Sequence, residues 1–255
     1  MPDAIRLKIK RQKDPGSRPY WEGFSIPYRP NMNIISVLLE IQERPVTAEG
    51  TRTTPVTWYC NCLEEVCGAC SMLINGRARQ ACSALVDQLS QPITLEPFSK
   101  FPCIRDLQVD RSSMFRNLIR AKAWIPIDGT YPLGEGPRLL PKVQEESYPY
   151  SRCMTCGCCL EVCPQFMPIR TEEDKKKNFV GAQIYGQVRL FNAHPTGQAI
   201  AHERIETMLE EGGLADCGNA QNCVKACPKD IPLTDAIAEL NREAVKQGIL
   251  GWFHK

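Results

Sequence analysis

Residues 153 to 164 read CMTCGCCLEVCP, and a related stretch, residues 217 to 228, reads CGNAQNCVKACP. The first stretch matches, at every cysteine, the spacing CxxCxxCxxxCP with which bacterial proteins bind iron-sulfur clusters. The second stretch matches the same spacing at three cysteines and the proline, but Ala220 stands at the second cysteine position. The chain therefore carries one complete motif and one motif that lacks a single thiol.

The two motifs predict two interleaved sets of ligands, because the fourth cysteine of each ferredoxin motif binds the cluster of the other. Three thiolates leave one corner iron of a cuboidal cluster unheld, so the damaged motif favours a 3Fe-4S cluster. A distant cysteine or a water on a labile fourth iron are the open alternatives. We expect a 4Fe-4S cluster on Cys153, Cys156, Cys159 and Cys227, and a 3Fe-4S cluster on Cys163, Cys217 and Cys223.

A third group of cysteines lies in residues 60 to 82, CNCLEEVCGACSMLINGRARQAC. Cys62, Cys67 and Cys70 have the CxxxxCxxC spacing of plant-type 2Fe-2S ferredoxins, and Cys82 completes the set. Cys60 competes with Cys62 for the first position, but the spacing favours Cys62. Zinc on the same thiolates is the alternative. We therefore predict a 2Fe-2S cluster in this segment.

The composition is that of a globular chain with bound metal. Fourteen cysteines in 255 residues, without an apolar leader or a twin arginine, indicate a reducing compartment and metal binding instead of disulfides. The formal net charge of +2 gives no reason to expect a nucleic-acid partner. The longest apolar runs, such as residues 34 to 39, are too short to cross a bilayer.

Some residues remain outside these motifs. The spacing assigns no role to Cys60, Cys103 and Cys158, which we expect to be buried thiols. The histidines form no recognisable nucleophile or metal motif, and no phosphate-binding loop is present, so we expect no catalytic residue in this chain. The three histidines are His194, His202 and His254.

The first hundred residues predict strands around one helix. Alternating apolar residues predict a hairpin from strands at 5–10 and 21–28. An apolar stripe at helical spacing predicts a helix that is capped by Asn33 and runs to about Glu43. Asn75-Gly76 predicts a tight hairpin turn. Further strands are expected at 56–59 and 93–95.

From about residue 106 the pattern becomes helical. We expect a helix around Phe115 to Ile119, an irregular connection at 126–141 and a solvated loop at 172–177. A helix is expected at 198–211, with Ile205, Met208 and Leu209 as its buried stripe, and a final helix at 234–247. The sequence therefore predicts a strand-rich first domain and a helical second domain.

The three cysteine motifs occur in a specific order: CLEEVCGAC with Cys82, then CMTCGCCLEVCP, then CGNAQNCVKACP. In this order and at these separations the chain resembles the iron-sulfur subunit of succinate dehydrogenase and quinol:fumarate reductase, respiratory complex II. The resemblance covers essentially the whole chain. It implies an α+β fold, with a β-grasp 2Fe-2S ferredoxin-like domain in residues 1–106 and an α-helical ferredoxin domain in residues 107–255.

The resemblance also implies a function and partners. Electrons would pass from a flavoprotein subunit with FAD, through the 2Fe-2S, 4Fe-4S and 3Fe-4S clusters, to a membrane quinone. A cytochrome b-type membrane anchor, often with haem, would hold this chain peripherally at the cytoplasmic side of the cell membrane. Pro164 would lie near the quinone.

Two departures from the family bear on the quinone. Relatives that reduce ubiquinone have a tryptophan at the position of Pro168 and a histidine at that of Gly218. Their absence favours a menaquinone-linked succinate dehydrogenase. The alternative is the iron-sulfur subunit of a quinol:fumarate reductase or of another flavin dehydrogenase. A free ferredoxin-like shuttle is disfavoured, because such carriers are usually strongly charged and this chain is nearly neutral.

Overall fold

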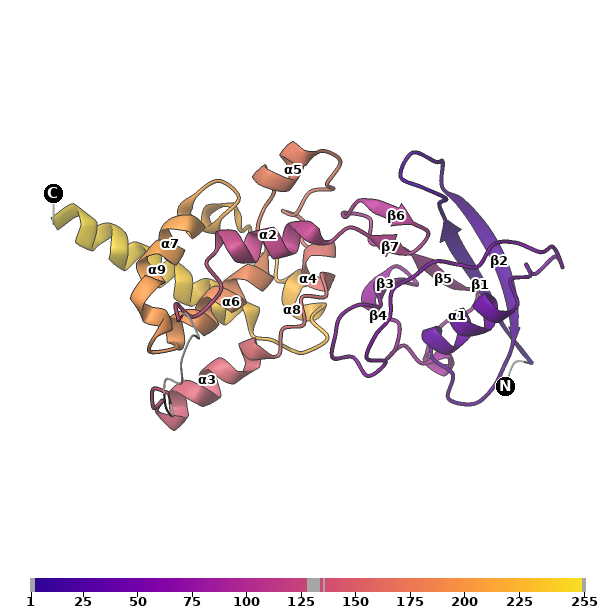
Figure 1. Ribbon diagram of the computed structural model, residues 1–255, viewed down its shortest axis with the longest axis horizontal. Helices are drawn as coiled ribbons and strands as arrows, with labels where there is room; N and C mark the ends of the chain where they lie inside the picture. The colour runs from indigo at the N-terminus through magenta and orange to yellow at the C-terminus, as the bar shows by residue number, and fades with distance from the viewer. Residues whose placement is uncertain (1–2, 128–133, 135, 254–255) are drawn as a thin grey trace. The chain divides into compact units, whose positions relative to one another are not determined.

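The computed structural model describes residues 3–127, 134 and 136–253 and divides the chain into two compact units. Unit 1 comprises residues 1–111, 154–161 and 168–170, and unit 2 comprises residues 112–153, 162–167 and 171–255. The strands belong to unit 1 and most helices to unit 2 (Figure 1). The chain therefore returns to unit 1 twice after residue 111. His254 lies outside the described residues.

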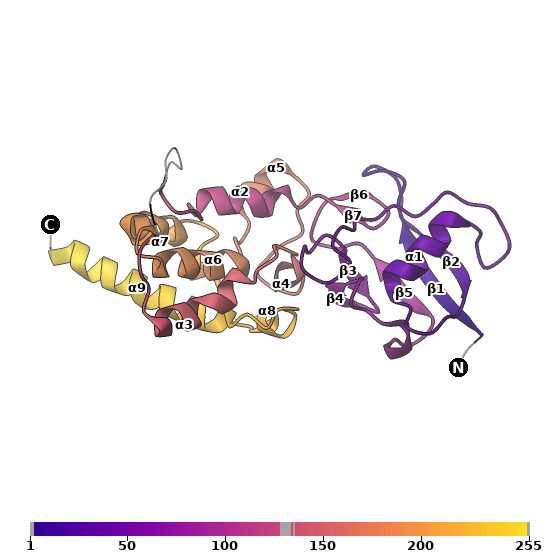
Figure 2. The same cartoon turned by 60° about the horizontal axis from the view of Figure 1, so that its bottom comes forward.

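Unit 1 is built on a five-stranded mixed sheet of order β2-β1-β5-β3-β4. β1 pairs antiparallel with β2 and parallel with β5, and β3 pairs antiparallel with β4 and β5. Helix α1 packs against the sheet, and alternate residues of β1 are buried with one face of α1 in a common core (Figures 1 and 2). The strands are Ala4–Arg11 (β1), Tyr20–Pro27 (β2), Ser71–Ile74 (β3), Arg77–Gln80 (β4) and Ile93–Glu96 (β5); α1 is Ile34–Glu43.

Smaller elements complete unit 1. Strands Cys103–Arg105 (β6) and Gln108–Val109 (β7) form a two-stranded sheet. A short 3-10 helix covers Val86–Gln88 (η1), and the one-turn helix Cys158–Glu161 (α4) comes from the segment that returns to this unit.

Several predictions for this half are confirmed. The strands at 5–10, 21–28 and 93–95 are β1, β2 and β5. The Asn33 side chain caps α1 by accepting a hydrogen bond from Ser36 N at 2.9 Å. Asn75 and Gly76 have φ of 49° and 73°, the left-handed conformation that a tight turn between β3 and β4 requires.

The predicted strand at 56–59 is wrong. Val56 is buried, but Thr57 is held by a loop of the same unit instead of by a neighbouring strand. Thr57 N donates to Asp106 Oδ2 at 2.9 Å, and Thr57 O accepts from Leu107 N at 3.1 Å. In this stretch Val56 is buried and Trp58 partly buried without a sheet, whereas Tyr59 is exposed.

Unit 2 is helical. Helix α6 lies against α3 and α9, and most of its residues are buried (Figures 1 and 2). The helices are Ser112–Arg120 (α2), Pro141–Ser151 (α3), Glu172–Lys177 (α5), Ala182–Ala193 (α6), Ala201–Leu209 (α7), Asn222–Lys225 (α8) and Leu233–Phe253 (α9), with 3-10 turns at Gly197–Ile200 (η2) and Leu214–Asp216 (η3).

The helices expected around 115–119 and at 234–247 are confirmed as α2 and the longer α9. Residues 128–133 and 135, within the predicted irregular connection, lie outside the described residues. The neighbouring residues 136–140 form no helix or strand, and α3 starts at Pro141. The sequence did not predict α3 or α6.

Two predictions for unit 2 are wrong. Residues 172–177 form helix α5 instead of a loop, because Thr171 and Asp174 form a capping box: Thr171 Oγ1 accepts from Asp174 N at 3.1 Å, and Asp174 Oδ2 accepts from Thr171 N at 2.8 Å. Leu209, expected in the buried stripe of α7, is 52% exposed at the end of the helix, whereas Ile205 and Met208 are buried.

Among the described residues, no helix is both long and apolar enough to cross a membrane.

Candidate iron-sulfur centres

The loop before β3 directs three backbone amides at the sulfur of Cys62. The N–H groups of Glu64, Val66 and Cys67 donate to Cys62 Sγ at 3.5, 3.3 and 3.3 Å. These amides, that of Glu64 first, lower the pKa of Cys62 to about 7. Cys60 is exposed, so the expectation that it is a buried thiol is wrong. The loop thus provides a stabilised thiolate at Cys62, the cysteine that the spacing favours.

The other three candidate ligands of the 2Fe-2S centre also belong to unit 1. Cys67 Sγ accepts from Ala69 N at 3.4 Å. Cys70 and Cys82 are buried, and burial together with the Cys70 side chain raises the pKa of Cys82 to about 12. Asn33 Nδ2 donates to Cys82 O at 2.8 Å and so fixes Cys82 to the start of α1. Iron binding would displace protons from the buried pair.

Gln80 forms a buried polar bridge beside this site. Its side chain is fully buried, and its Nε2 donates to Ser71 Oγ at 2.9 Å and to Cys158 Sγ at 3.6 Å. Gln80 Oε1 accepts from Cys70 Sγ at 3.6 Å. Cys158 is therefore a buried thiol, as expected, and lies in the surroundings of Cys70. Cys103 is half-buried, and its thiol donates to Asp106 O at 3.7 Å.

Arg111 joins two cysteine-bearing segments of unit 1. Its guanidinium donates to Gly68 O at 2.7 Å, Ala69 O at 3.3 Å and Cys156 O at 3.0 Å. Burial lowers the pKa of Arg111, and the nearby thiols, that of Cys156 first, oppose this shift. The charge of Arg111 thus lies near candidate ligands of two different clusters.

Gly68 packs closely against residues 154 to 156 of the complete motif. It has a φ of +69°, and a Cβ there would lie 2.7 Å from Met154 O and 2.9 Å from Cys156 Cβ. Met154 O is a backbone atom and Cys156 Cβ is attached directly to the backbone, so neither can move aside by a change of side-chain rotamer. Only glycine therefore fits between the 2Fe-2S loop and the complete motif.

The candidate ligands of the 4Fe-4S cluster are divided between the units. Cys156 and Cys159 belong to unit 1, and Cys153 and Cys227 belong to unit 2. The Cys158 thiol is the largest of the influences that lower the pKa of Cys156 to about 7. This ligand set remains a prediction from the spacing.

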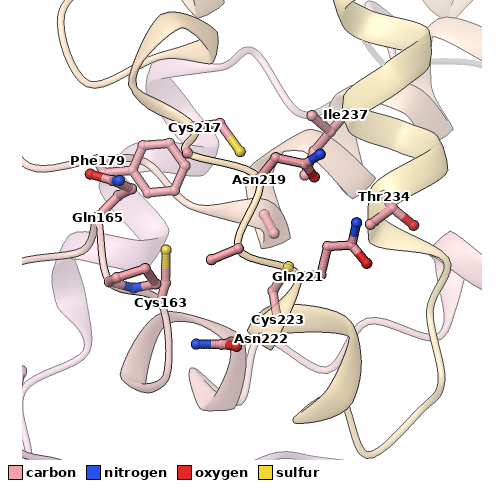
Figure 3. Close-up of a pocket in the computed structure, with 14 residues that line it drawn as sticks. Cys163, Gln165, Phe179, Cys217, Asn219, Gln221, Asn222, Cys223, Thr234 and Ile237 are labelled. Atoms are coloured by element: carbon pink, nitrogen blue, oxygen red, sulfur yellow. The ribbon is translucent and has the colours of Figure 1, made fainter.

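The three candidate ligands of the 3Fe-4S cluster surround one cavity of unit 2, which we call the three-cysteine hollow; Cys163 comes from the complete motif, and Cys217 and Cys223 come from the damaged motif. It encloses about 400 Å³, including space open to solvent, and is lined by Cys163, Cys217, Cys223, Pro164 and Ala220 among others. Figure 3 shows the three sulfurs turned toward this space, from the residues after α4, after η3 and in α8. Burial raises the pKa of Cys223. The donor set, three thiols with a methyl group in the fourth position, fits a three-iron cluster.

In the part of the chain that the structure describes, no three His, Cys, Asp or Glu side chains converge closely enough to hold one metal ion. The thiolates of a cluster bind different irons, so they stand farther apart than the ligands of a single ion.

Taken together, the strand-rich unit with its cysteine loop and the helical unit with its three-cysteine hollow define an iron-sulfur protein of the ferredoxin type. Two family models agree with this class. Residues 6–116 match a 2Fe-2S iron-sulfur cluster binding domain, and residues 149–231 match a 4Fe-4S dicluster domain.

Comparison with similar proteins identifies the family within this class. The chain is 58% identical over 250 residues to the succinate dehydrogenase iron-sulfur subunit of Bacillus subtilis (strain 168), covering 98% of this chain and 96% of that protein. It is 30% identical to the fumarate reductase iron-sulfur subunit of Wolinella succinogenes, covering 90% and 91%. A chain of the Mycobacterium smegmatis Sdh1 complex in the apo form has the same fold, with a TM-score of 0.72 at 23% identity and 96% coverage of both chains.

The chain belongs to the family of iron-sulfur subunits of succinate dehydrogenase and fumarate reductase, respiratory complex II. It is an electron-transfer subunit of a complex II oxidoreductase, with 2Fe-2S and 4Fe-4S cluster domains. The predicted α+β fold, an N-terminal 2Fe-2S ferredoxin-like domain followed by a helical ferredoxin domain, is confirmed.

Proposed function

We propose that this chain relays single electrons from a flavoprotein subunit with bound FAD to a membrane quinone in a succinate:quinone oxidoreductase. The observation that carries this proposal is the three-cysteine hollow, in which Ala220 takes the place of a fourth thiol. A three-iron centre there, added to the 2Fe-2S and 4Fe-4S domains, would give the chain three redox centres. Such a number fits a relay better than a structural role, for which one cluster in each unit would suffice.

The proposed ligands follow the motif spacing. Clusters with different iron content and surroundings have different reduction potentials, which a relay requires. The ligand sets are Cys62, Cys67, Cys70 and Cys82 for 2Fe-2S, Cys153, Cys156, Cys159 and Cys227 for 4Fe-4S, and Cys163, Cys217 and Cys223 for 3Fe-4S.

The clusters would supply one-electron redox chemistry, and the chain's own groups would hold and tune them. The amides around Cys62 stabilise negative charge on its sulfur, which favours both the bound thiolate and the reduced cluster. Arg111 adds positive charge near the 2Fe-2S and 4Fe-4S ligands. The tight contact of Gly68 with Cys156 gives a short protein path between the first two ligand sets.

The quinone end is proposed to lie near Pro164, which lines the three-cysteine hollow with Cys163. Gly218 also lines it, and the side chain nearest to Gly218 is Gln165: a Cβ at Gly218 would lie 2.6 Å from Gln165 Nε2. A glycine in place of the family's histidine supports menaquinone as the acceptor. A cytochrome b-type anchor with haem would hold the chain peripherally at the cytoplasmic side of the membrane.

The direction is proposed to be succinate oxidation, since the Bacillus subtilis relative at 58% identity is a succinate dehydrogenase subunit. A quinol:fumarate reductase is the second candidate, which the 30% identical Wolinella succinogenes subunit supports more weakly.

Ala220→Cys tests the ligand assignment in the intact complex, purified through this chain. We expect the wild type to show the paramagnetic signal of an oxidised 3Fe-4S cluster. The variant should lose that signal, because a fourth thiolate favours a four-iron cluster, and it should reduce quinone more slowly because the potential of that cluster is lower. The signal should be measured by electron paramagnetic resonance (EPR), and the rate with menaquinone and ubiquinone analogues.

Ala215→Cys is the matched control, because Ala215 is exposed, lies two residues before Cys217 and is not among the residues that line the hollow. It adds a thiol to the same segment and should keep the wild-type signal. A three-iron signal that survives unchanged in Ala220→Cys would contradict the ligand assignment. Failure of a flavoprotein to co-purify with the wild type would contradict the proposed partner.

A further inference from the structure

Tyr185, in α6, is a fully buried tyrosine whose hydroxyl has no hydrogen-bond partner among the residues that the structure describes. Leaving a buried polar group unpaired destabilises a protein, so native proteins rarely retain one. A phenylalanine would fill the same space without that cost. We therefore expect the Tyr185 hydroxyl to donate a hydrogen bond to a group that is not part of the polypeptide.

The three-cysteine hollow lies beside Tyr185. Ala182 lines the hollow and precedes Tyr185 by three residues in α6, so both lie on the same face of the helix. Phe179, which also lines the hollow, packs edge-on against the Tyr185 ring, with ring centroids 5.9 Å apart and an interplanar angle of 71°. The tyrosine does not itself line the hollow, but it packs against Phe179, which does.

The electrostatic surroundings point to the same site. Burial raises the pKa of Tyr185 far above its ordinary value, and negative charge on Cys217, Asp216 and Cys163 raises it further. Two of these three groups are proposed cluster ligands. The hydroxyl therefore stays protonated and is available as a donor.

We propose that Tyr185 Oη donates a hydrogen bond to a sulfur of the three-cysteine centre, a cysteine thiolate or an inorganic sulfide, and thereby raises its reduction potential. Reduction adds negative charge to the cluster sulfurs, so a hydrogen-bond donor stabilises the reduced form more than the oxidised form. A raised potential at this centre would draw electrons to the last member of the relay. This inference rests on the proposed function, because it requires a cluster in the hollow.

The competing acceptor is the Asp216 carboxylate. Asp216 is exposed, and its Oδ2 already accepts from Gly212 N at 2.8 Å. If Tyr185 turned to this carboxylate instead, removal of its hydroxyl would leave the proton couplings of the cluster unchanged.

The test compares Tyr185→Phe with the wild type in the intact complex. An EPR-monitored redox titration gives the midpoint potential of the three-iron centre, and pulsed EPR in H2O and D2O detects exchangeable protons coupled to it. We expect the variant to keep the centre, to lose one strongly coupled exchangeable proton and to show a lower midpoint potential. An unchanged potential with unchanged couplings would overturn the proposal.

Tyr150→Phe is the matched control, since Tyr150 is a buried tyrosine of unit 2 whose hydroxyl already donates to Pro232 O at 3.3 Å. It should leave both the potential and the couplings at wild-type values. If Tyr185→Phe fails to assemble, the wild type alone decides: the absence of any strongly coupled exchangeable proton overturns the proposal. If the wild type shows no three-iron signal, the proposed function fails instead, and the two failures are distinguishable.

Discussion

At the scale of single residues, the chain places polar or charged groups close to its cysteines. Cys62 Sγ accepts three amide hydrogen bonds, Gln80 bridges Cys70 and Cys158, and Arg111 lies near Cys156. Such groups bind no iron themselves, but they set the local charge and the solvation of the sulfurs. The reduction potentials of the clusters should therefore respond to changes at these positions.

Arg111→Met tests this influence in unit 1. It removes a positive charge and leaves the carbonyls of Gly68, Ala69 and Cys156 without their donor. We expect a loss of about 3 kcal/mol in stability, because a hydrogen bond to a charged group contributes about 1.5–3 kcal/mol. The midpoint potential of the 2Fe-2S cluster should fall. The denaturant dependence of its visible absorption and a redox titration measure the two effects.

Arg111→Lys serves as the control, because it keeps the charge but cannot donate in the fork geometry of a guanidinium. It should retain most of the potential and lose part of the stability. If Arg111→Met matched the wild type in both measurements, the assigned role of Arg111 would be wrong.

At the scale of elements, close packing fixes the loops that hold the cysteines. Gly68 and Gly76 both have positive φ, but their surroundings differ: a Cβ at Gly68 would meet Met154 O and Cys156 Cβ at less than 3.0 Å, whereas nothing lies within 4 Å of a Cβ at Gly76. The two glycines therefore separate the cost of backbone strain from the cost of a steric clash.

Gly68→Ala should destabilise the chain much more than Gly76→Ala. The left-handed conformation costs an alanine about 1–2 kcal/mol at either position, and only Gly68 adds the clash. We expect Gly76→Ala to fold with its 2Fe-2S cluster and Gly68→Ala to lose most of that cluster. Cluster content from visible absorption and the denaturation midpoint measure the difference; equal effects of the two substitutions would contradict this account of Gly68.

The sequence predicts those elements whose signal is local. Asn33 and the apolar stripe after it predict α1, and Asn75-Gly76 predicts the turn between β3 and β4. Helix α6 was missed because Gln183, Tyr185 and Gly186 are buried along with its apolar residues, so it lacks the polar face that reveals an amphipathic helix. The short helix α5 depends on a capping box that a reading of its charges alone overlooks.

The residues of the candidate sites also fall into two groups, those that a local sequence pattern predicts and those that it does not. Motif spacing assigns the cysteines, because ligand geometry is encoded in short loops. Gln80, Arg111 and Tyr185 belong to no motif, since their roles arise from packing between segments far apart in the sequence. No local signal marks them.

At the scale of the whole molecule, the central part of the complete motif, residues 154–161, is held in unit 1. The buried Glu161 accepts hydrogen bonds from Ser99 N at 2.8 Å, Ser99 Oγ at 2.6 Å and Lys100 N at 3.2 Å. Residues 154–161 are therefore part of the strand-rich unit, although the sequence pattern places them in the helical half. The boundary at residue 106 separates a strand-rich from a helical sequence pattern. The two compact units do not follow this boundary alone, because each is built from several segments that alternate along the chain.

The central claim is that the chain holds three clusters of two, four and three irons. Iron analysis and EPR of the intact wild-type complex test it most directly. The account predicts about nine iron atoms per copy of this chain, after subtraction of any haem iron, and a signal from an oxidised 3Fe-4S cluster that disappears on mild reduction. Zinc in place of iron, or about four irons per chain without that signal, would contradict it.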